Sequence, residues 1–172
     1  MKKLTKMMLT KWHYFEHKII DFEDINFLTG KNSSGKSTLI DALQVVLLGE
    51  TDGTSFNKAA DIKATRSFTS YIVGELGDDI NGGEKSLRGG KEFTTQLVCE
   101  FKDTMNDEYF CIGILVDSYS DMANAKRTFF RLRDRLDESD FIYDNQPRNI
   151  NQFKGWCREK YGKDDKAIKF MD

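Results

Sequence analysis

The chain has 172 residues, of which 39% are hydrophobic and 31% charged, and its formal net charge is −2. This composition suits one compact domain with a real core, and it excludes a globally basic chain that nucleic acid or a membrane would attract as a whole. No apolar run approaches the roughly 18 residues of a membrane span, so we expect a cytoplasmic chain without membrane contact. The cysteines, Cys99, Cys111 and Cys157, are odd in number and far apart, which favours buried, reduced thiols.

The first part of the chain predicts three strands and a helix. Two short strands are expected over residues 4–12 and 17–22, and a third, over residues 25–30, runs directly into a loop with two glycines. Residues 36–48 then carry apolar side chains at helical spacing. Gly49 follows them at the position where a helix commonly has its C-terminal cap.

The next segment predicts mostly irregular structure. Residues 50–67 are loop-like, and a short helix or strand is expected over residues 67–76. Residues 77–91 contain five glycines, which predict a turn or a mobile loop. The basic residues of the first of these segments are Lys58, Lys63 and Arg66.

The last part predicts antiparallel strands followed by a helix. Residues 93–101 alternate between an apolar and a polar face, and residues 108–117 are almost all apolar, as in a strand buried on both faces. Residues 127–136 alternate again, and helical spacing returns over residues 149–162. The apolar face of the first strand comprises Phe93, Thr95, Leu97, Cys99 and Phe101, and that of the helix comprises Ile150, Phe153, Cys157 and Tyr161. Because this order is not a regular βα alternation, we expect an α/β fold with mixed and antiparallel strands packed around the helix after the glycine loop.

Residues 30–37 read Gly-Lys-Asn-Ser-Ser-Gly-Lys-Ser and fit the phosphate-loop pattern GxxxxGK[ST]. The glycines of such a loop permit a tight turn, so that backbone N–H groups can point at phosphate oxygens, and the following helix adds the positive end of its dipole. Lys36 is placed to reach the β- and γ-phosphates, Ser37 offers a hydroxyl to Mg²⁺, and Thr38 can reach the α-phosphate. The predicted nucleotide ligands are Gly30, Lys31, Asn32, Ser33, Ser34, Gly35, Lys36, Ser37 and Thr38.

Hydrolysis of a nucleotide also needs a carboxylate that holds Mg²⁺ and a group that orients the attacking water. Asp117 ends a buried strand, as the magnesium aspartate of many phosphate-loop enzymes does, but Ser118 and Tyr119 follow it in place of a glutamate base. We therefore favour an ordinary core strand whose last residue meets solvent. A self-contained P-loop phosphotransferase with Asp117 on the metal is one alternative, and a non-catalytic nucleotide-sensing module is another.

Four arginines share one face of the strand predicted over residues 127–136. Side chains two residues apart on a strand lie about 6.6 Å from each other, close enough to follow a nucleic-acid backbone. We favour a solvated strand face over nucleic-acid contact, since acidic residues lie nearby. The arginines are Arg127, Arg131, Arg133 and Arg135, and the acidic neighbours are Asp134, Asp137 and Glu138.

Two predicted strands followed by "INFLTGKNSSGKSTLIDALQVVLLG" resemble the N-terminal half of an SMC-type ATPase head, a class that includes the SMC, MukB and SbcC proteins. The stretches "MLTKWHYFEHKIIDF", "FNKAA", "YIVGELGDD" and "DSYSD" are similar to the condensin-like ATP-binding subunits (JetC) of bacterial Wadjet plasmid-defence systems. The resemblance covers nearly the whole chain. It implies that residues 1–172 are the N-terminal lobe of an ABC-type head and a fragment of a longer protein, without the coiled coil and the C-terminal lobe.

The resemblance further implies that ATP and Mg²⁺ bind between this lobe, the C-terminal lobe of the same head and a second head, and that the intact dimer acts on DNA. The catalytic residues stay unknown, because the signature serine, the magnesium aspartate, the catalytic glutamate and the switch histidine of such heads are not found in this sequence. We therefore expect ATPase activity in the intact protein and none in this chain alone.

Two further nucleotide contacts follow from the same resemblance. Relatives carry a basic residue just after the first strand, which corresponds to His13, and an arginine after the first helix, for which Arg66 is the nearest match and Lys63 the rival. A half-buried histidine at a strand edge and a solvated loop charge are the respective alternatives.

Overall fold

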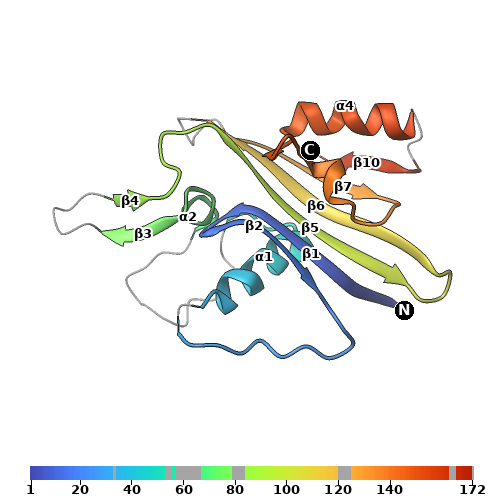
Figure 1. The fold of residues 1–172 in the computed structure, drawn as a ribbon, viewed down its shortest axis with the longest axis horizontal. Coiled ribbons are helices and arrows are strands. Elements are labelled where there is room, and N and C mark those ends of the chain that lie inside the picture. Colours follow the sequence, from blue (N-terminus) through green and yellow to red (C-terminus); the bar gives the residue numbers. More distant parts are fainter. Residues whose placement is uncertain are drawn as a thin grey trace.

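The computed structural model describes residues 1–32, 34–52, 56, 67–78, 84–119, 125–162 and 166–171. Its centre is a six-stranded sheet with the order β10-β7-β6-β5-β1-β2 (Figure 1). Every strand pairing of the described residues is antiparallel. The strands of the sheet are β1 (Lys2–Trp12), β2 (Phe15–Asp21), β5 (Phe93–Asp103), β6 (Glu108–Ser118), β7 (Lys126–Leu132) and β10 (Ile168–Met171).

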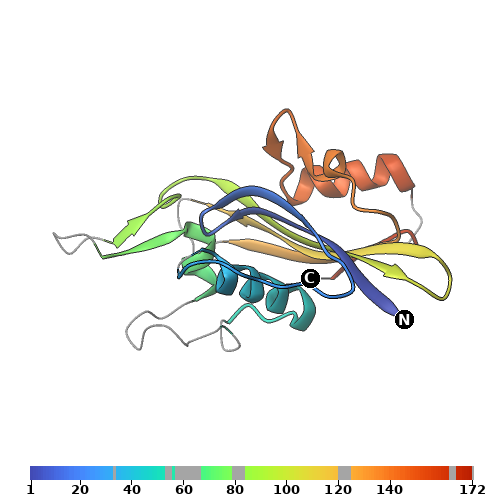
Figure 2. The same cartoon turned by 60° about the horizontal axis from the view of Figure 1, so that its bottom comes forward.

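Helices cover the two faces of this sheet. Figure 2 shows α1 (Lys36–Leu48) beneath the sheet and α4 (Ile150–Tyr161) above it. The shorter helices are α2 (Phe68–Val73) and α3 (Glu138–Phe141), and two small hairpins pair β3 (Glu75–Asp78) with β4 (Glu84–Ser86) and β8 (Ile142–Tyr143) with β9 (Gln146–Pro147). Among the described helices, none has both the length and the apolar character that crossing a membrane requires.

The core on the α1 side confirms the predicted helix and the apolar face of residues 93–101. Leu39, Ala42 and Val45 of α1 pack against Leu97 and Cys99 of β5. Gly49 adopts the left-handed conformation (φ 70°) and its N–H closes the helix on the carbonyl of Val45, as the sequence predicts. Apolar residues on one stripe of the helix and on one face of the strand therefore form a single hydrophobic layer.

The core on the α4 side confirms the predicted helix stripe. Phe153 and Cys157 of α4 pack with Phe141 of α3 and Phe130 of β7, and the rings of Phe141 and Phe153 stack 4.9 Å apart. All three cysteines are buried and free, as predicted, and burial raises the pKa of the Cys99 thiol to about 12.

The face of residues 93–101 predicted to be polar is buried as well. Gln96 is fully buried, and its amide donates to the carbonyl oxygens of Phe141 (3.1 Å) and Arg148 (2.9 Å). Glu100 is also fully buried and accepts from the Thr5 hydroxyl (2.6 Å) and the Leu136 N–H (2.7 Å). Residues 138–161 cover this face, so its polar side chains are satisfied inside the protein instead of by water.

The strand predicted over residues 25–30 is not formed. Residues 23–30 run as an extended segment outside the sheet, along the lower edge of Figure 1, and none of them pairs with a described strand. Ile25 and Phe27 are 75% and 85% exposed. A strand exists only where a neighbouring strand accepts its backbone hydrogen bonds, so the apolar pattern is present but the strand prediction was wrong for this chain.

Two other predicted elements differ in extent. The glycine-rich segment 77–91 was predicted as a turn or a mobile loop, but it contributes to the β3–β4 hairpin and buries Arg88. The strand predicted over residues 127–136 ends at Leu132; one more bond to the β10 side follows, from the Arg133 N–H to the Ala167 carbonyl, and the chain then turns toward α3. Leu136 nevertheless joins the α4-side core, as its place in the pattern predicts.

Candidate functional site

The loop at residues 30–37 connects the extended segment to α1, and its two glycines have conformations that other residues rarely adopt. Gly30 has φ 151° and Gly35 has φ 95°. A Cβ atom on Gly30 would lie 2.6 Å from the Ser34 hydroxyl oxygen, and one on Gly35 would lie 2.6 Å from the Tyr14 hydroxyl oxygen. The pattern thus places glycine where the backbone turns sharply and where a neighbouring side chain approaches closely.

Lys36 turns its side chain back onto the loop. Its ammonium donates to the carbonyl oxygens of Gly30 (2.7 Å) and Lys31 (2.8 Å) and to the Ser34 hydroxyl (3.3 Å). The Ser34 N–H donates to the Lys31 carbonyl (3.3 Å), so the loop closes on itself around the cation. The three oxygens that accept from the Lys36 ammonium at the start of α1 are all neutral, and none belongs to a carboxylate.

The N-terminus of α1 carries no side-chain cap. Gly35 is the N-cap residue, and among the described residues the first turn has no side-chain cap hydrogen bond. The first N–H groups of a helix have no partner within the helix, and they carry the positive end of its dipole. Ser37 is half-buried in this turn, and Thr38 is buried beside it. An uncapped helix start next to a lysine ammonium is an electropositive end of the kind that binds anions.

The remaining predicted ligands are placed as follows. Lys31, Asn32 and Ser34 are exposed on the loop. Ser33, Lys63 and Arg66 lie outside the described residues, so the nucleotide contacts expected of them stay predictions.

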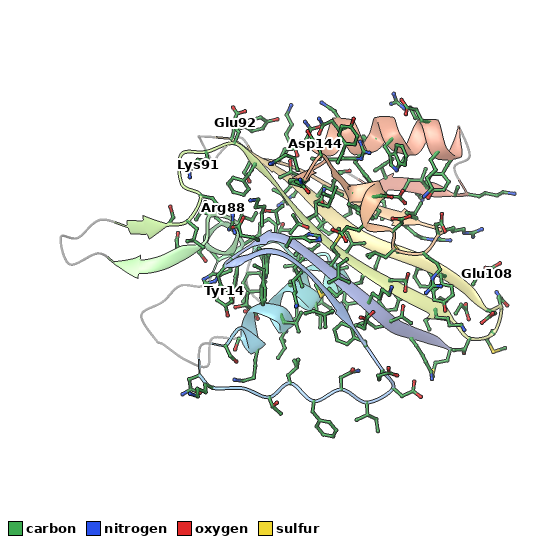
Figure 3. The ribbon with its side chains drawn as sticks, viewed as in Figure 1. Tyr14, Arg88, Lys91, Glu92, Glu108 and Asp144 are labelled. Carbon is green, nitrogen blue, oxygen red and sulfur yellow. The ribbon has the colours of Figure 1, made fainter. Side chains whose placement is uncertain are left out.

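His13 lies in the turn between β1 and β2, where its φ is 48°. Its backbone N–H donates to the backbone carbonyl of Tyr71 (2.6 Å). Its ring packs edge-on against the rings of Tyr14 and Tyr71, with centroid distances of 4.7 Å and 5.5 Å. Its neighbour Tyr14, labelled in Figure 3, is the residue of this turn whose hydroxyl approaches Gly35. The β1–β2 turn (residues 12–15) therefore packs beside the phosphate loop.

Aromatic residues packed behind this turn connect it to α1, and their role was not predicted from the sequence. Trp12 is fully buried; its indole N–H donates to the Thr38 carbonyl (3.0 Å), and its ring stacks on that of Tyr71 at 4.7 Å. The Tyr71 hydroxyl in turn donates to the buried Asp41 carboxylate of α1. The signal in the sequence was the run Trp-His-Tyr-Phe at positions 12–15, four rings in a row at the end of a predicted strand.

Asp117 lies on the other face of the sheet from α1. Its carboxylate accepts from the Thr94 hydroxyl (2.8 Å) and from the N–H of Ile150 (3.1 Å), the first residue of α4. Burial raises the pKa of Asp117, although both hydrogen bonds act in the opposite direction. Asp117 thus connects a core strand to α4, and the sheet lies between it and the phosphate loop. This position supports the interpretation of Asp117 as a core residue, not as a magnesium ligand.

The four arginines considered as a phosphate-tracking face do not stay together. Arg127 donates to the Thr51 hydroxyl beyond α1, and Arg131 follows on the same strand, β7. Arg135 lies beyond the strand, where its guanidinium stacks over the Tyr109 ring (4.3 Å) and lies 3.9 Å from the Glu100 carboxylate. The prediction of one continuous row was therefore wrong, because the strand ends before the last two arginines.

A polar cleft of about 570 Å³ opens at the end of the sheet near the β3–β4 hairpin. Its charged lining residues are Lys11, Glu16, Arg88, Lys91, Glu92 and Asp117. Arg88, Lys91 and Glu92 are labelled near this end of the molecule in Figure 3. None of the described phosphate-loop residues lines this cleft, so it is separate from the loop.

Comparison with known proteins agrees with the geometry of the loop. Residues 4–63 match the family model described as the P-loop containing region of AAA domain. Over 167 residues the chain is 25% identical to the SbcC subunit of the nuclease SbcCD from Staphylococcus haemolyticus (strain JCSC1435). That alignment covers 92% of this chain and 14% of the relative, so the chain spans about one seventh of the length of the protein that it matches. These similarities support an N-terminal region of an SMC- or SbcC-like P-loop ATPase.

Proposed function

We propose that this chain binds ATP with Mg²⁺ at residues 30–38. The observation that carries the proposal is the Lys36 ammonium, held on the carbonyl oxygens of Gly30 and Lys31 at the uncapped start of α1. Carbonyl oxygens are weaker partners for an ammonium than phosphate oxygens, so a polyphosphate competes well for this lysine. The cation and the uncapped N–H groups together fit an anion with several oxygens.

Each residue of the site then has a defined part. Gly30 and Gly35 let the backbone of the loop approach the phosphates, and Lys36 neutralises the terminal phosphate groups. The Ser37 hydroxyl takes part in holding Mg²⁺, and Thr38 lies one residue further along the same turn. Mg²⁺ bound there would neutralise charge on the phosphates of the nucleotide. His13, in the turn beside the loop, is proposed as a neighbour of the nucleotide, and so is Arg66.

We further propose that residues 1–172 are the N-terminal lobe of an ABC/SMC-type head and that a C-terminal lobe completes it. Two exposed apolar surfaces support this. Ile25 and Phe27 project from the extended segment, and Leu47 and Leu48 are exposed at the end of α1. Exposed apolar clusters of this kind mark surfaces that another element covers. A further lobe that supplies the missing neighbouring strand would pair residues 25–30 and bury these side chains.

The activity of the intact protein follows as a wider proposal. The relative is named as a subunit of a nuclease, and SMC-like heads dimerise around ATP, so the intact protein is proposed to be a cytoplasmic ATPase whose heads close on ATP, open on hydrolysis and act on DNA. Within this class we propose a condensin-like subunit of a Wadjet-type system. If the intact protein and its neighbours limit plasmid maintenance in cells, Lys36→Ala should abolish that effect; an effect independent of Lys36 would count against ATP as its energy source.

The binding proposal is tested by titrating the purified chain with ATP and MgCl₂ in a calorimeter. Lys36→Ala should weaken binding by about tenfold or more, since charge-assisted hydrogen bonds contribute about 1.5–3 kcal/mol and 1.4 kcal/mol is a factor of ten. Lys91→Ala, an exposed lysine away from the loop, is the matched control and should bind as the wild type does. The absence of any ATP binding by the wild type, or equal binding by Lys36→Ala, would refute the proposal.

A further inference from the structure

Arg88 is a buried arginine in the middle of the segment that the sequence predicts to be a loop. It is 5% exposed. Its Nη1 group donates to the carbonyl oxygens of His13 (2.6 Å) and Ile72 (3.3 Å), and its Nη2 group donates to the Glu16 carboxylate. One guanidinium thus joins three elements: the turn after β1, the end of α2 and the start of β2.

The turn that Arg88 holds is conformationally strained. His13 in this turn has a φ of 48°, and Lys11, in β1 just before the turn, has a φ of 54°. Neither residue is a glycine. Positive φ at such residues costs free energy and persists only where surrounding contacts impose it. Arg88 contributes such a contact at the carbonyl of His13, and partial burial of Glu16 is outweighed by hydrogen bonds from Lys11 and Arg88 that hold the pKa of its carboxyl below its usual range.

The same turn sets the position of the phosphate loop. The Tyr14 hydroxyl and the Phe15 ring lie against Gly35, at 2.6 Å and 3.1 Å from the place that a Cβ atom would take. On the inner side, Trp12 donates to the carbonyl of Thr38 in the first turn of α1. The start of α1, which supplies the loop with its uncapped N–H groups, is thus packed on residues on both sides of His13.

A purely structural arginine does not explain all of these contacts. Within the part of the chain that the structure describes, the buried Nε atom of Arg88 has no hydrogen-bond partner, so the side chain holds a desolvated donor that none of these residues satisfies. Stability alone would favour an arrangement that satisfies this group. The two Nη groups are instead committed to fixing a strained turn beside the candidate site, which is where such strain is commonly found.

We infer that Arg88 is a positioning residue of the nucleotide site, which acts through the 12–15 turn to hold Gly35 and the start of α1 in the conformation that receives phosphate. This inference rests on the proposed function. Arg88 itself lines the polar cleft on the other side of the turn, and its hydrogen bonds go to His13, Ile72 and Glu16, none of which belongs to the loop. Its effect on the nucleotide is therefore indirect.

The test measures ATP–Mg²⁺ affinity and Trp12 emission in a Trp156→Phe background, where Trp12 is the one tryptophan left of the two in the chain. Arg88→Met should weaken ATP binding by about tenfold, within the range usual for coupling between sites. ATP should shift the Trp12 emission of the parent and shift that of Arg88→Met less at saturation, because Arg88 no longer holds the turn that packs on the loop. Arg148→Met is the matched control: Arg148 is half-buried and its Nε, like that of Arg88, has no partner among the described residues, but it packs on Tyr143 and Trp156 at the α4 side. It should bind ATP as its parent does.

A second variant keeps the test decisive if Arg88→Met fails to fold. Tyr14 is 39% exposed, so Tyr14→Leu should fold and still weaken ATP binding. Where Arg88→Met folds, the two substitutions together should weaken binding no more than the stronger one alone, since they interrupt the same path. Losses that add would overturn the inference, as would unchanged affinity in Arg88→Met or in Tyr14→Leu. A wild type that binds no ATP would instead overturn the proposed function, and this inference with it.

Discussion

Gly35 shows how much of the site depends on a single residue. Its φ of 95° strains any residue with a side chain, and a Cβ atom there would lie 2.6 Å from the Tyr14 hydroxyl, which would have to move. We expect Gly35→Ala to lower the free energy of unfolding by about 1–3 kcal/mol, because alanine is strained at positive φ, and to weaken ATP binding. The control is Gly155→Ala in α4, where the added methyl group meets nothing and should stabilise the helix by about 0.5–1 kcal/mol. Urea unfolding followed by circular dichroism measures both; equal effects of the two substitutions would contradict the role assigned to Gly35.

Glu16 makes the stability of the folded chain depend on pH. The hydrogen bonds from Lys11 and Arg88 lower the pKa of Glu16 from its ordinary value of 4.5 in spite of partial burial. A carboxyl whose pKa is lower in the folded state contributes stability above the unfolded pKa and loses it as the pH falls through the folded pKa. Wild type should therefore exceed Glu16→Gln in stability at pH 7, by no more than about 1 kcal/mol because Glu16 is largely exposed, and the difference should vanish at strongly acidic pH. A difference that grows on acidification would show that the ion pair is not its source.

The extended segment before the loop and the end of α1 are elements whose apolar side chains are left exposed. Phe27→Asp should change the stability of the isolated chain by no more than about 0.5 kcal/mol, since the side chain is exposed. The same change should prevent assembly with the proposed C-terminal lobe, because it places a charge on the apolar segment that this lobe is proposed to bury. Phe153→Ala in the α4-side core is the contrasting control and should cost about 3–5 kcal/mol. Thermal unfolding and co-purification with the second lobe measure these effects; assembly of Phe27→Asp at wild-type strength would exclude this segment from the interface.

For the molecule as a whole, the arrangement around the sheet separates Asp117 from nucleotide chemistry. The phosphate loop leads into α1 on one face of the sheet, and the Asp117 carboxylate accepts from the first N–H of α4, the helix on the other face. Figure 2 shows the two helices on opposite faces. We expect the isolated chain to bind ATP without appreciable turnover, and Asp117→Asn to leave ATP affinity unchanged. Because burial raises the pKa of Asp117, its ionised form is disfavoured in the folded protein relative to the unfolded chain, so removing the charge should not lower stability at pH 7. Substantial wild-type turnover that Asp117→Asn abolishes would favour the self-contained phosphotransferase.

Local patterns in the sequence were sufficient for the phosphate loop, for α1 with its cap at Gly49, and for the apolar faces of β5 and α4. In each case the signal is short-range: a spacing of glycines, or a period that matches one helix stripe or one strand face. Such a period indicates which side of a helix or strand is apolar. The α1-side and α4-side cores then form as those patterns require, with Leu97 and Phe153 at the predicted positions.

Only the tertiary structure decided which elements have partners and what covers each face. Residues 25–30 have a strand pattern but pair with no described strand, and Gln96 and Glu100 have a polar pattern but lie under residues 138–161. Arg88, within a glycine-rich segment, is buried because the turn after β1 and the end of α2 meet around it. A local pattern cannot specify these outcomes, because pairing and burial depend on backbone groups and surfaces that the chain brings together from distant positions.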